Sequence, residues 1–126
     1  MAETLISPIN MTSNSAPSPY VASALSEYDG SYAAWKAFDG SSGSCWGATA
    51  GQYASWLKIN IGAGYAVYKY KLTAHTGYYG YAPKDFKLYG SNNDSSWTEL
   101  DSQTGQSFTS GEVKTYTFSN STEYQY

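Results

Sequence analysis

The sequence has no arginine, a single cysteine and few charged residues of either sign. All seven basic residues are lysines, and charged residues occupy 13% of the 126 positions. The lone cysteine, Cys45, has no partner for an internal disulfide. Without arginine, the chain lacks the side chain that grips phosphates and carboxylates with a planar pair of donors. The net charge is −3 and no basic run occurs, so the composition excludes nucleic acid as a partner.

Long apolar runs are missing as well. No stretch approaches the roughly 18 consecutive apolar residues that a membrane-spanning helix requires. Residues 1–10 lack the basic region and the long apolar core of a secretory leader. We therefore expect no membrane insertion. Export would depend on a leader outside this sequence or on assembly into a larger particle.

Catalytic motifs are not found. A glycosidase needs two carboxylates that face each other across the scissile bond, whereas the ten acidic residues are scattered through turn-like contexts. Neither Gly-x-Ser-x-Gly nor His-Glu-x-x-His is present. Cys45 lies far in sequence from the only histidine, His75, so we expect a small, buried, inert residue beside Trp46 rather than a nucleophile. The sequence predicts that the protein is not an enzyme.

Aromatic residues are abundant. The chain has 14 tyrosines and 4 tryptophans, and aromatics make up 17% of all residues. Tyrosine combines an apolar face with a polar tip, so surfaces that are rich in tyrosine and poor in charge suit uncharged, polyhydroxylated ligands.

Short alternating segments, separated by Gly, Asn and Ser, run through the chain. Leu57–Ile61, for example, alternates as a half-buried strand does. Such spacing predicts an all-β sandwich or jelly roll, in one domain over residues 20–126. Residues 1–19 are interpreted as an extended N-terminal arm, because prolines favour extended backbone. Residues 33–38 form the only predicted helical patch, with Trp35 and Phe38 on one face. The expected strands cover 20–24, 57–61, 68–74, 86–89, 97–100 and 115–118.

The segment 36–46, Lys-Ala-Phe-Asp-Gly-Ser-Ser-Gly-Ser-Cys-Trp, brings an acidic residue into a Gly/Ser loop that ends at a tryptophan. An oxygen-lined loop of this kind suits a hard cation such as calcium. The alternative is that Asp39-Gly40 is a plain turn capped by Ser44.

Three segments in this order resemble the discoidin, or F5/8 type C, family, including its carbohydrate-binding modules of family 32. They are 36–46, Trp-Leu-Lys-Ile-Asn-Ile-Gly at 56–62, and Pro-Lys-Asp-Phe-Lys-Leu-Tyr-Gly-Ser-Asn at 83–92 followed by Trp97. The resemblance implies a galactose-binding-domain-like β-sandwich jelly roll that binds sugars or phospholipids through loops at one end. The N-terminal region also resembles versions in phage tail proteins. The family's final strand is missing, so we expect a longer natural chain or a strand donated by a partner.

The resemblance also implies site residues. For a structural calcium ion, it implies a side-chain oxygen from Asp39, carbonyl oxygens from Lys36 and Ser41, and hydroxyl and carbonyl oxygens from Ser44.

For ligand binding, the loop 74–82 concentrates a histidine and three tyrosines between glycines, and the family places further tyrosines near the same end. The alternative is that these tyrosines pack on one another and that the histidine is structural. The candidate ligand-binding residues are His75, Tyr78, Tyr79, Tyr81, Tyr28, Tyr32 and Tyr53.

The sequence thus predicts a non-catalytic carbohydrate-binding or adhesion module, extracellular or virion-associated, whose partner is a glycan. A neutral sugar of the galactose or N-acetylhexosamine type is favoured, because no arginine is available for an acidic one. The rival hypothesis is a structural module that binds other domains or subunits of a phage virion or extracellular assembly. Phospholipid binding is disfavoured, because the loops carry tyrosine and glycine instead of aliphatic and basic residues.

Overall fold

The computed structural model describes residues 4–126. The first part of the predicted arm, residues 1–3, lies outside them. The chain divides into two compact units, the first ending at Gly62 and the second spanning Ala63–Tyr126. Each unit is described by itself. None of the helices in the described part of the chain has the length and apolar character to cross a membrane.

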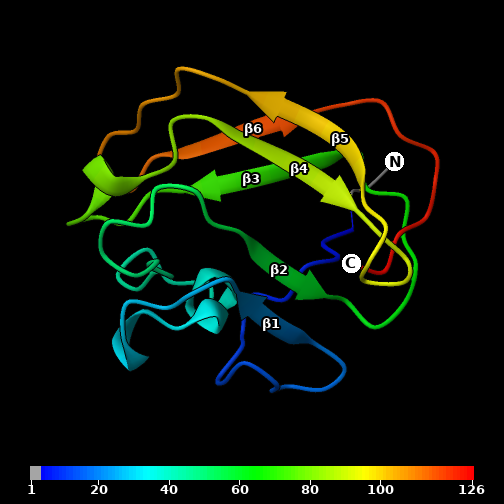
Figure 1. Cartoon of the computed structure of the whole chain (residues 1–126), viewed down its shortest axis with the longest axis horizontal. Helices are drawn as coiled ribbons and strands as arrows, with labels where there is room; N and C mark the ends of the chain where they lie inside the picture. Colours follow the sequence, from blue (N-terminus) through cyan, green and yellow to red (C-terminus); the bar gives the residue numbers. More distant parts are fainter. Residues whose placement is uncertain (1–3) are drawn as a thin grey trace. The chain divides into compact units, whose positions relative to one another are not determined.

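The first unit is built on one antiparallel strand pair. Strand β1 (Val21–Ala24) pairs with β2 (Leu57–Asn60), so that Val21 faces Asn60 and Ala24 faces Leu57 (Figure 1). Two short 3₁₀ helices, η1 (Gly30–Tyr32) and η2 (Ala34–Phe38), lie in the connection between the strands. The predicted strand at 20–24 and the predicted helical patch at 33–38 are confirmed.

Three small or flexible side chains form the centre of this unit. Met11, Ala22 and Ala34 are at most 2% exposed, and they come from the N-terminal segment, β1 and η2. Trp35 and Phe38 both pack against them, as their spacing on η2 predicts. Trp46, which ends the Gly/Ser loop, joins the same cluster.

The N-terminal segment does not follow the predicted extended path throughout. It turns at 12–16, where the Thr12 amide donates to the Ala16 carbonyl at 3.0 Å. It turns again where the Tyr20 amide donates to the Pro17 carbonyl at 3.1 Å. Met11 of this segment is 2% exposed and belongs to the core cluster, so the segment contributes to the packing of the first unit.

The second unit contains two further antiparallel pairs. Strand β3 (Lys69–Thr73) pairs with β6 (Val113–Thr117), and β4 (Phe86–Gly90) pairs with β5 (Thr98–Gln103) (Figure 1). In the second pair, Leu88 faces Asp101 and Tyr89 faces Glu99, so Leu100 is the extra residue of a bulge.

Aromatic rings fill the interior of the second unit. Tyr70 and Tyr116, partners across β3 and β6, stack with ring centroids 5.1 Å apart. Phe86 of β4 meets both rings edge-on, at 6.5 and 5.5 Å. The hydroxyl of Tyr70 donates to Oδ2 of Asp101 on β5 at 2.7 Å. One tyrosine thus ties together the β3–β6 and β4–β5 pairs within this unit.

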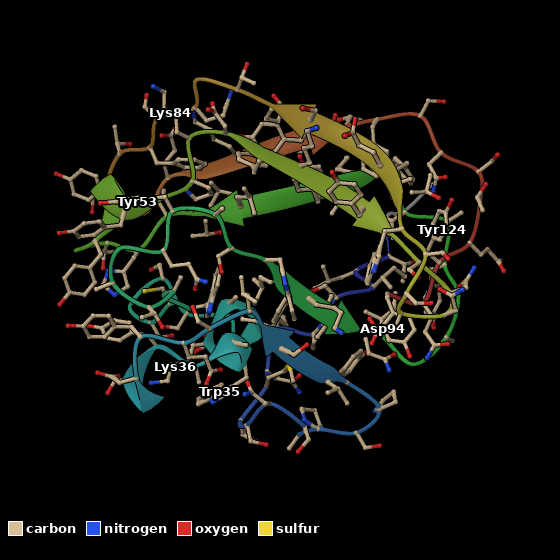
Figure 2. All side chains as sticks on the ribbon, in the orientation of Figure 1. Trp35, Lys36, Tyr53, Lys84, Asp94 and Tyr124 are labelled. Carbon is tan, nitrogen blue, oxygen red and sulfur yellow. The ribbon has the colours of Figure 1, made fainter. Side chains whose placement is uncertain are left out.

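The C-terminal residues of the chain are held against the turn that follows β4. Ser91 and Tyr126 exchange backbone hydrogen bonds of 3.1 and 2.9 Å, and Tyr65 pairs with Tyr124 in an isolated bridge. The ring of Tyr124, labelled in Figure 2, covers Gly90 so closely that a Cβ there would lie 2.6 Å from two of its atoms. Gly90 is therefore required by this contact.

Several sequence expectations need correction. Residues 33–38 are not the only helical patch, because η1 and η3 (Tyr79–Tyr81) are also 3₁₀ helices. Leu57 begins a segment expected to alternate between a buried and an exposed face, but it is 36% exposed. Tyr68 begins the expected strand 68–74 and is 47% exposed. Each strand belongs to a sheet of only two strands, so the burial of alternate residues is incomplete.

The Tyr70–Asp101 hydrogen bond predicts a pH-dependent contribution to stability. This bond, followed by one from Gln103, lowers the pKa of the Asp101 carboxyl. A carboxyl whose pKa is lower in the folded state stabilises the fold above its unfolded pKa, and this stabilisation is lost as the pH falls through the folded-state pKa. Tyr70→Phe should therefore reduce the free energy of unfolding by about 1 kcal/mol at neutral pH, and by less in acid.

Urea denaturation curves of parent and variant, recorded between neutral and acidic pH, measure this difference. The matched control is Tyr89→Phe, which removes a hydroxyl from a 44% exposed tyrosine of β4 and should be close to neutral. A Tyr70→Phe effect that is absent, or that stays constant as Asp101 takes up its proton, would show that the bond does not stabilise the unit.

Candidate functional site

The predicted metal loop, Lys36 to Ser44, begins within η2 and continues beyond its end in the first unit. Asp39 accepts the Ser41 amide on Oδ1 at 3.0 Å, and Oδ2 accepts the hydroxyl of Ser44. The hydroxyl of Ser41 in turn accepts the amide of Gly43 at 3.1 Å. The carboxylate therefore closes its own loop, and two side-chain oxygens, from Asp39 and Ser44, lie together on it.

Gly40 allows this loop to fold against the N-terminal segment. Its φ is +77°, in the left-handed region, and a Cβ at this position would lie 2.5 Å from the carbonyl oxygen of Ile9. Nearby, the Met11 amide donates a hydrogen bond of 3.1 Å to the Phe38 carbonyl, which also holds the N-terminal segment against the end of η2. The loop is thus held in place by the backbone on both sides of Asp39.

The candidate metal ligands share this one short segment. Lys36 lies on η2, next to Trp35 in Figure 2, and its ammonium is 5.4 Å from the centroid of the Trp35 ring. Asp39 is the one carboxylate among the four predicted ligands. Within residues 4–126, no group of three or more His, Cys, Asp or Glu side chains could hold a metal ion. Any cation here would depend mainly on hydroxyl and carbonyl oxygens.

Two residues that the sequence analysis did not single out position η2. Oε2 of Glu27 accepts the Ala34 amide at 2.6 Å and the side-chain amide of Asn14 at 3.1 Å. Oδ1 of Asn14 accepts the Trp35 amide at 2.9 Å. These side chains cap the first turn of η2 from distant parts of the sequence. Because Glu27 precedes η2 by seven residues, the spacing is not that of a capping box and gives no sequence signal.

Tyr28 and Tyr32 form an aromatic pair on the loop that contains η1. Their ring centroids are 5.6 Å apart, edge to face. The Tyr28 amide donates to the Gly47 carbonyl at 2.7 Å, and the Gly47 amide donates to the Tyr32 carbonyl at 3.1 Å. The pair is therefore fixed against the chain around Gly47.

Tyr53 lies on the segment that continues from this point, and it is labelled in Figure 2. Its side chain is 100% exposed. The residue before it, Gln52, donates its amide to the Thr49 carbonyl at 3.0 Å and accepts the hydroxyl of Ser26 on its side chain. Ser26 also accepts the Thr49 amide, at 3.0 Å. The two tyrosine-bearing loops of the first unit are thus joined through Ser26.

The aromatic loop, defined here as residues 75–82 of the second unit, is organised by His75. Its Nδ1 accepts the amides of Gly77 at 2.8 Å and Tyr78 at 3.0 Å. Since Nδ1 is occupied as an acceptor, the neutral ring carries its proton on Nε2 and offers a donor there. His75 therefore has the structural role in the loop that the alternative interpretation proposed.

Three aromatic rings follow one another along this loop. His75 stacks on Tyr78 with ring centroids 4.7 Å apart, and Tyr78 lies 6.4 Å from Tyr81. Tyr78, Tyr79 and Tyr81 are 48%, 43% and 87% exposed. The 3₁₀ turn of η3 spaces the tyrosines, because the Tyr81 amide donates to the Tyr78 carbonyl at 3.0 Å. The rings support one another and still present large faces to solvent.

Contacts within each unit thus bring together three groups of predicted residues. They join the metal-loop residues Asp39, Ser41 and Ser44, the pair Tyr28 and Tyr32, and the series His75, Tyr78 and Tyr81. Cys45 differs from expectation, since it is only half-buried. Burial still raises the pKa of its thiol, outweighing the opposite effect of Lys36, which is consistent with an unreactive residue.

Comparison with known proteins adds a family and a fold. The family model described as the NedA-like, galactose-binding domain of F5/8 type C matches residues 36–126, more than two thirds of the chain. No curated protein matches the chain.

Similar solved structures include CpGH89CBM32-5 from Clostridium perfringens, in complex with GalNAc-β-1,3-galactose. It is 20% identical, with a TM-score of 0.72 over 84% of this chain and 78% of that one. The family 32 carbohydrate-binding module of NanJ from C. perfringens, in complex with galactose, is 24% identical, with a TM-score of 0.71 over 84% and 77%. Chitosan-binding module 1 from a chitosanase/glucanase of Paenibacillus sp. IK-5 is 27% identical, with a TM-score of 0.67 over 82% and 76%. These likenesses confirm the predicted all-β, galactose-binding-type β-sandwich.

The capping role of Glu27 leads to a prediction about the first unit. Glu27→Ala would leave the Ala34 amide and the Asn14 side chain without their acceptor, and should cost about 1–2 kcal/mol of stability. It should also speed hydrogen exchange of the Ala34 amide. Glu27→Gln keeps an acceptor oxygen at the same position, so its loss of stability should be clearly smaller. Equal losses in the two variants, measured by urea denaturation and amide exchange, would contradict the capping role.

Proposed function

The chain belongs to the F5/8 type C family, among its NedA-like galactose-binding domains, and we propose that it is a non-catalytic carbohydrate-binding domain that recognises a neutral sugar. The observation that carries this proposal is the series of partly exposed rings formed by His75, Tyr78 and Tyr81. Aromatic faces carry partial negative charge and attract the C–H face of a sugar ring. The Nε2–H group of His75 and the tyrosine hydroxyls can bond to its hydroxyl groups.

The charges of the chain support a neutral ligand. No arginine is available to hold the carboxylate of an acidic sugar, and the net charge of −3 disfavours anions. The ligands named for the similar structures are galactose, GalNAc-β-1,3-galactose and, for the Paenibacillus module, chitosan. We therefore favour a galactose- or N-acetylhexosamine-type sugar. Affinity should fall roughly between millimolar and micromolar, or about 4 to 8 kcal/mol, as expected of a small contact.

A glycan array, followed by titration calorimetry with the best ligand, tests this proposal. Tyr81→Ala and Tyr79→Ala should each weaken binding about fivefold, the equivalent of roughly 1 kcal/mol for one lost ring contact. Both should leave the melting temperature nearly unchanged, because these side chains are exposed. Tyr89→Ala is the matched control, since it removes an exposed tyrosine from strand β4. The site assignment fails if both loop variants bind as tightly as the parent. If an array with good positive controls shows no ligand, the function itself is wrong.

We also propose that the loop from Lys36 to Ser44 holds a structural calcium ion weakly. Calcium takes oxygen ligands, and Oδ2 of Asp39 and the hydroxyl of Ser44 already lie in contact. The residues therefore fit a cation site, with carbonyls of Lys36 and Ser41 as further ligands. Because affinity rises with the number of charged ligands, a single carboxylate favours weak binding.

Asp39→Asn tests the calcium proposal. An asparagine oxygen can still accept the Ser41 amide, so the turn remains while the charge is lost. Millimolar calcium should raise the melting temperature of the parent by mass action and should not raise that of this variant. Asp29→Asn is the control, because Asp29 accepts the Ser31 amide at 2.7 Å in a similar turn of the same unit. If neither calcium nor a chelator changes the melting temperature of the parent, the proposal is refuted.

A further inference from the structure

The segment 104–112 lies along the aromatic loop and contacts the start of it. The hydroxyl of Ser110 donates to the Thr76 carbonyl at 2.7 Å, and the Ala74 amide donates to the Glu112 carbonyl at 2.9 Å. Gly111 lies so close that a Cβ there would be 3.4 Å from the methyl group of Thr76. Residues more than thirty positions apart are therefore in direct contact at this point.

The same segment also holds the chain just beyond the aromatic loop. The Gln106 amide donates to the carbonyl of Lys84, which is labelled in Figure 2, at 2.9 Å. The Gly105 amide donates to Oδ1 of Asp85 at 2.8 Å. The start of the aromatic loop and the chain just beyond its end are thus attached to one neighbouring segment.

The segment 104–112 is itself anchored in the interior of the second unit. Phe108 is only 9% exposed, and the Lys114 ammonium lies 4.8 Å from the centroid of its ring. The side chain of Gln106 accepts the hydroxyl of Tyr116, a residue of the aromatic core, at 2.8 Å. Glu112 closes a local turn by accepting the Thr109 amide at 2.9 Å. The segment that contacts the loop is therefore itself held by residues of the core of the unit.

One peptide group connects this support to the ligand-facing rings. The carbonyl of the Thr76–Gly77 peptide accepts the Ser110 hydroxyl, while the amide of the same peptide donates to Nδ1 of His75. Because a peptide group is planar, fixing its carbonyl also fixes the direction of its N–H. The Ser110 hydroxyl is thus linked through one planar peptide to the imidazole on which Tyr78 stacks.

We propose that Ser110 and Asp85 are positioning residues for glycan recognition, acting through the aromatic loop without touching the ligand. This inference rests on the proposed carbohydrate-binding function. Gly77 and Gly80 give the loop wide backbone freedom, and ordering a loop on binding reduces affinity. By holding the loop at its start and just beyond its end, the segment 104–112 removes much of that cost before the ligand arrives.

Ser110→Ala tests this directly. The Gly77 and Tyr78 amides should exchange about threefold faster, because a partly exposed hydrogen bond that orients their acceptor is lost. Affinity for the glycan that the parent binds should fall by a similar factor, with a less favourable binding entropy in calorimetry. Ser110→Thr, which keeps the hydroxyl, should restore both values. Ser107→Ala, an exposed serine of the same segment, is the matched control and should change neither.

Asp85 provides an independent test at the other end of the loop. Asp85→Asn keeps the acceptor of the Gly105 amide and should behave as the parent, whereas Asp85→Ala should weaken glycan binding. If Ser110→Ala does not fold, the two Asp85 variants still test whether the segment 104–112 positions the loop for glycan binding.

The outcomes separate this inference from the proposed function. Unchanged exchange at Gly77 in Ser110→Ala would overturn the positioning role, and so would faster exchange with unchanged affinity. A parent that binds no glycan would refute the carbohydrate-binding function, and with it the role of Ser110 in recognition. Amide exchange would then still report whether the segment 104–112 holds the loop.

Discussion

The aromatic loop of the second unit depends on the imidazole of His75, whose Nδ1 accepts two successive backbone amides. Two glycines within the loop would otherwise leave its backbone free to adopt many conformations. The chain has one cysteine, so no internal disulfide can restrict this loop. A single side chain therefore defines the turn, supports the Tyr78 ring by stacking and keeps one donor for a ligand.

The loops of the first unit follow the same physical rule. Asp39 and Asp29 each close a turn by accepting an amide two residues ahead, and Glu27 caps η2 from a distance. In a chain with few charges and a single cysteine, these side-chain acceptors for backbone amides order the loops of the first unit. Ordered loops matter here because exposed rings can bind a weak ligand only if little entropy is lost on binding.

The sequence predicted features that depend on local patterns. Alternation located the strands β2, β3, β4 and β6 to within a few residues, because it reports the two faces of a strand directly. The helices η1 and η3 were missed, since three-residue 3₁₀ turns carry no periodic signal. The burial of Leu57 was overestimated, because alternation says which residues share a face but not whether another layer covers it.

In the candidate site, too, contacts between residues close in sequence could be predicted, whereas contacts between distant residues could not. The stacking of His75 on Tyr78 joins residues three positions apart, and the concentration of aromatics in 74–82 was visible in the sequence. The pairing of Tyr28 with Tyr32 is equally local. By contrast, Glu27 and Ser110 act on residues 7 and 34 positions away, and their identity gives no hint of the partner. Such contacts depend on how the strands and loops are arranged in space, whereas alternation predicts only the strands and the fold class.

The central claim is that the rings of the aromatic loop contact a neutral sugar. NMR titration of the uniformly labelled chain with a galactose- or N-acetylhexosamine-type oligosaccharide tests it most directly. We predict that the largest shift changes occur at the ring resonances of His75, Tyr78 and Tyr81 and at the amides of 75–82, and that they saturate at one ligand. Shift changes centred on Tyr89 of β4 and on Trp97, the residue before β5, with the aromatic loop unaffected, would contradict the account.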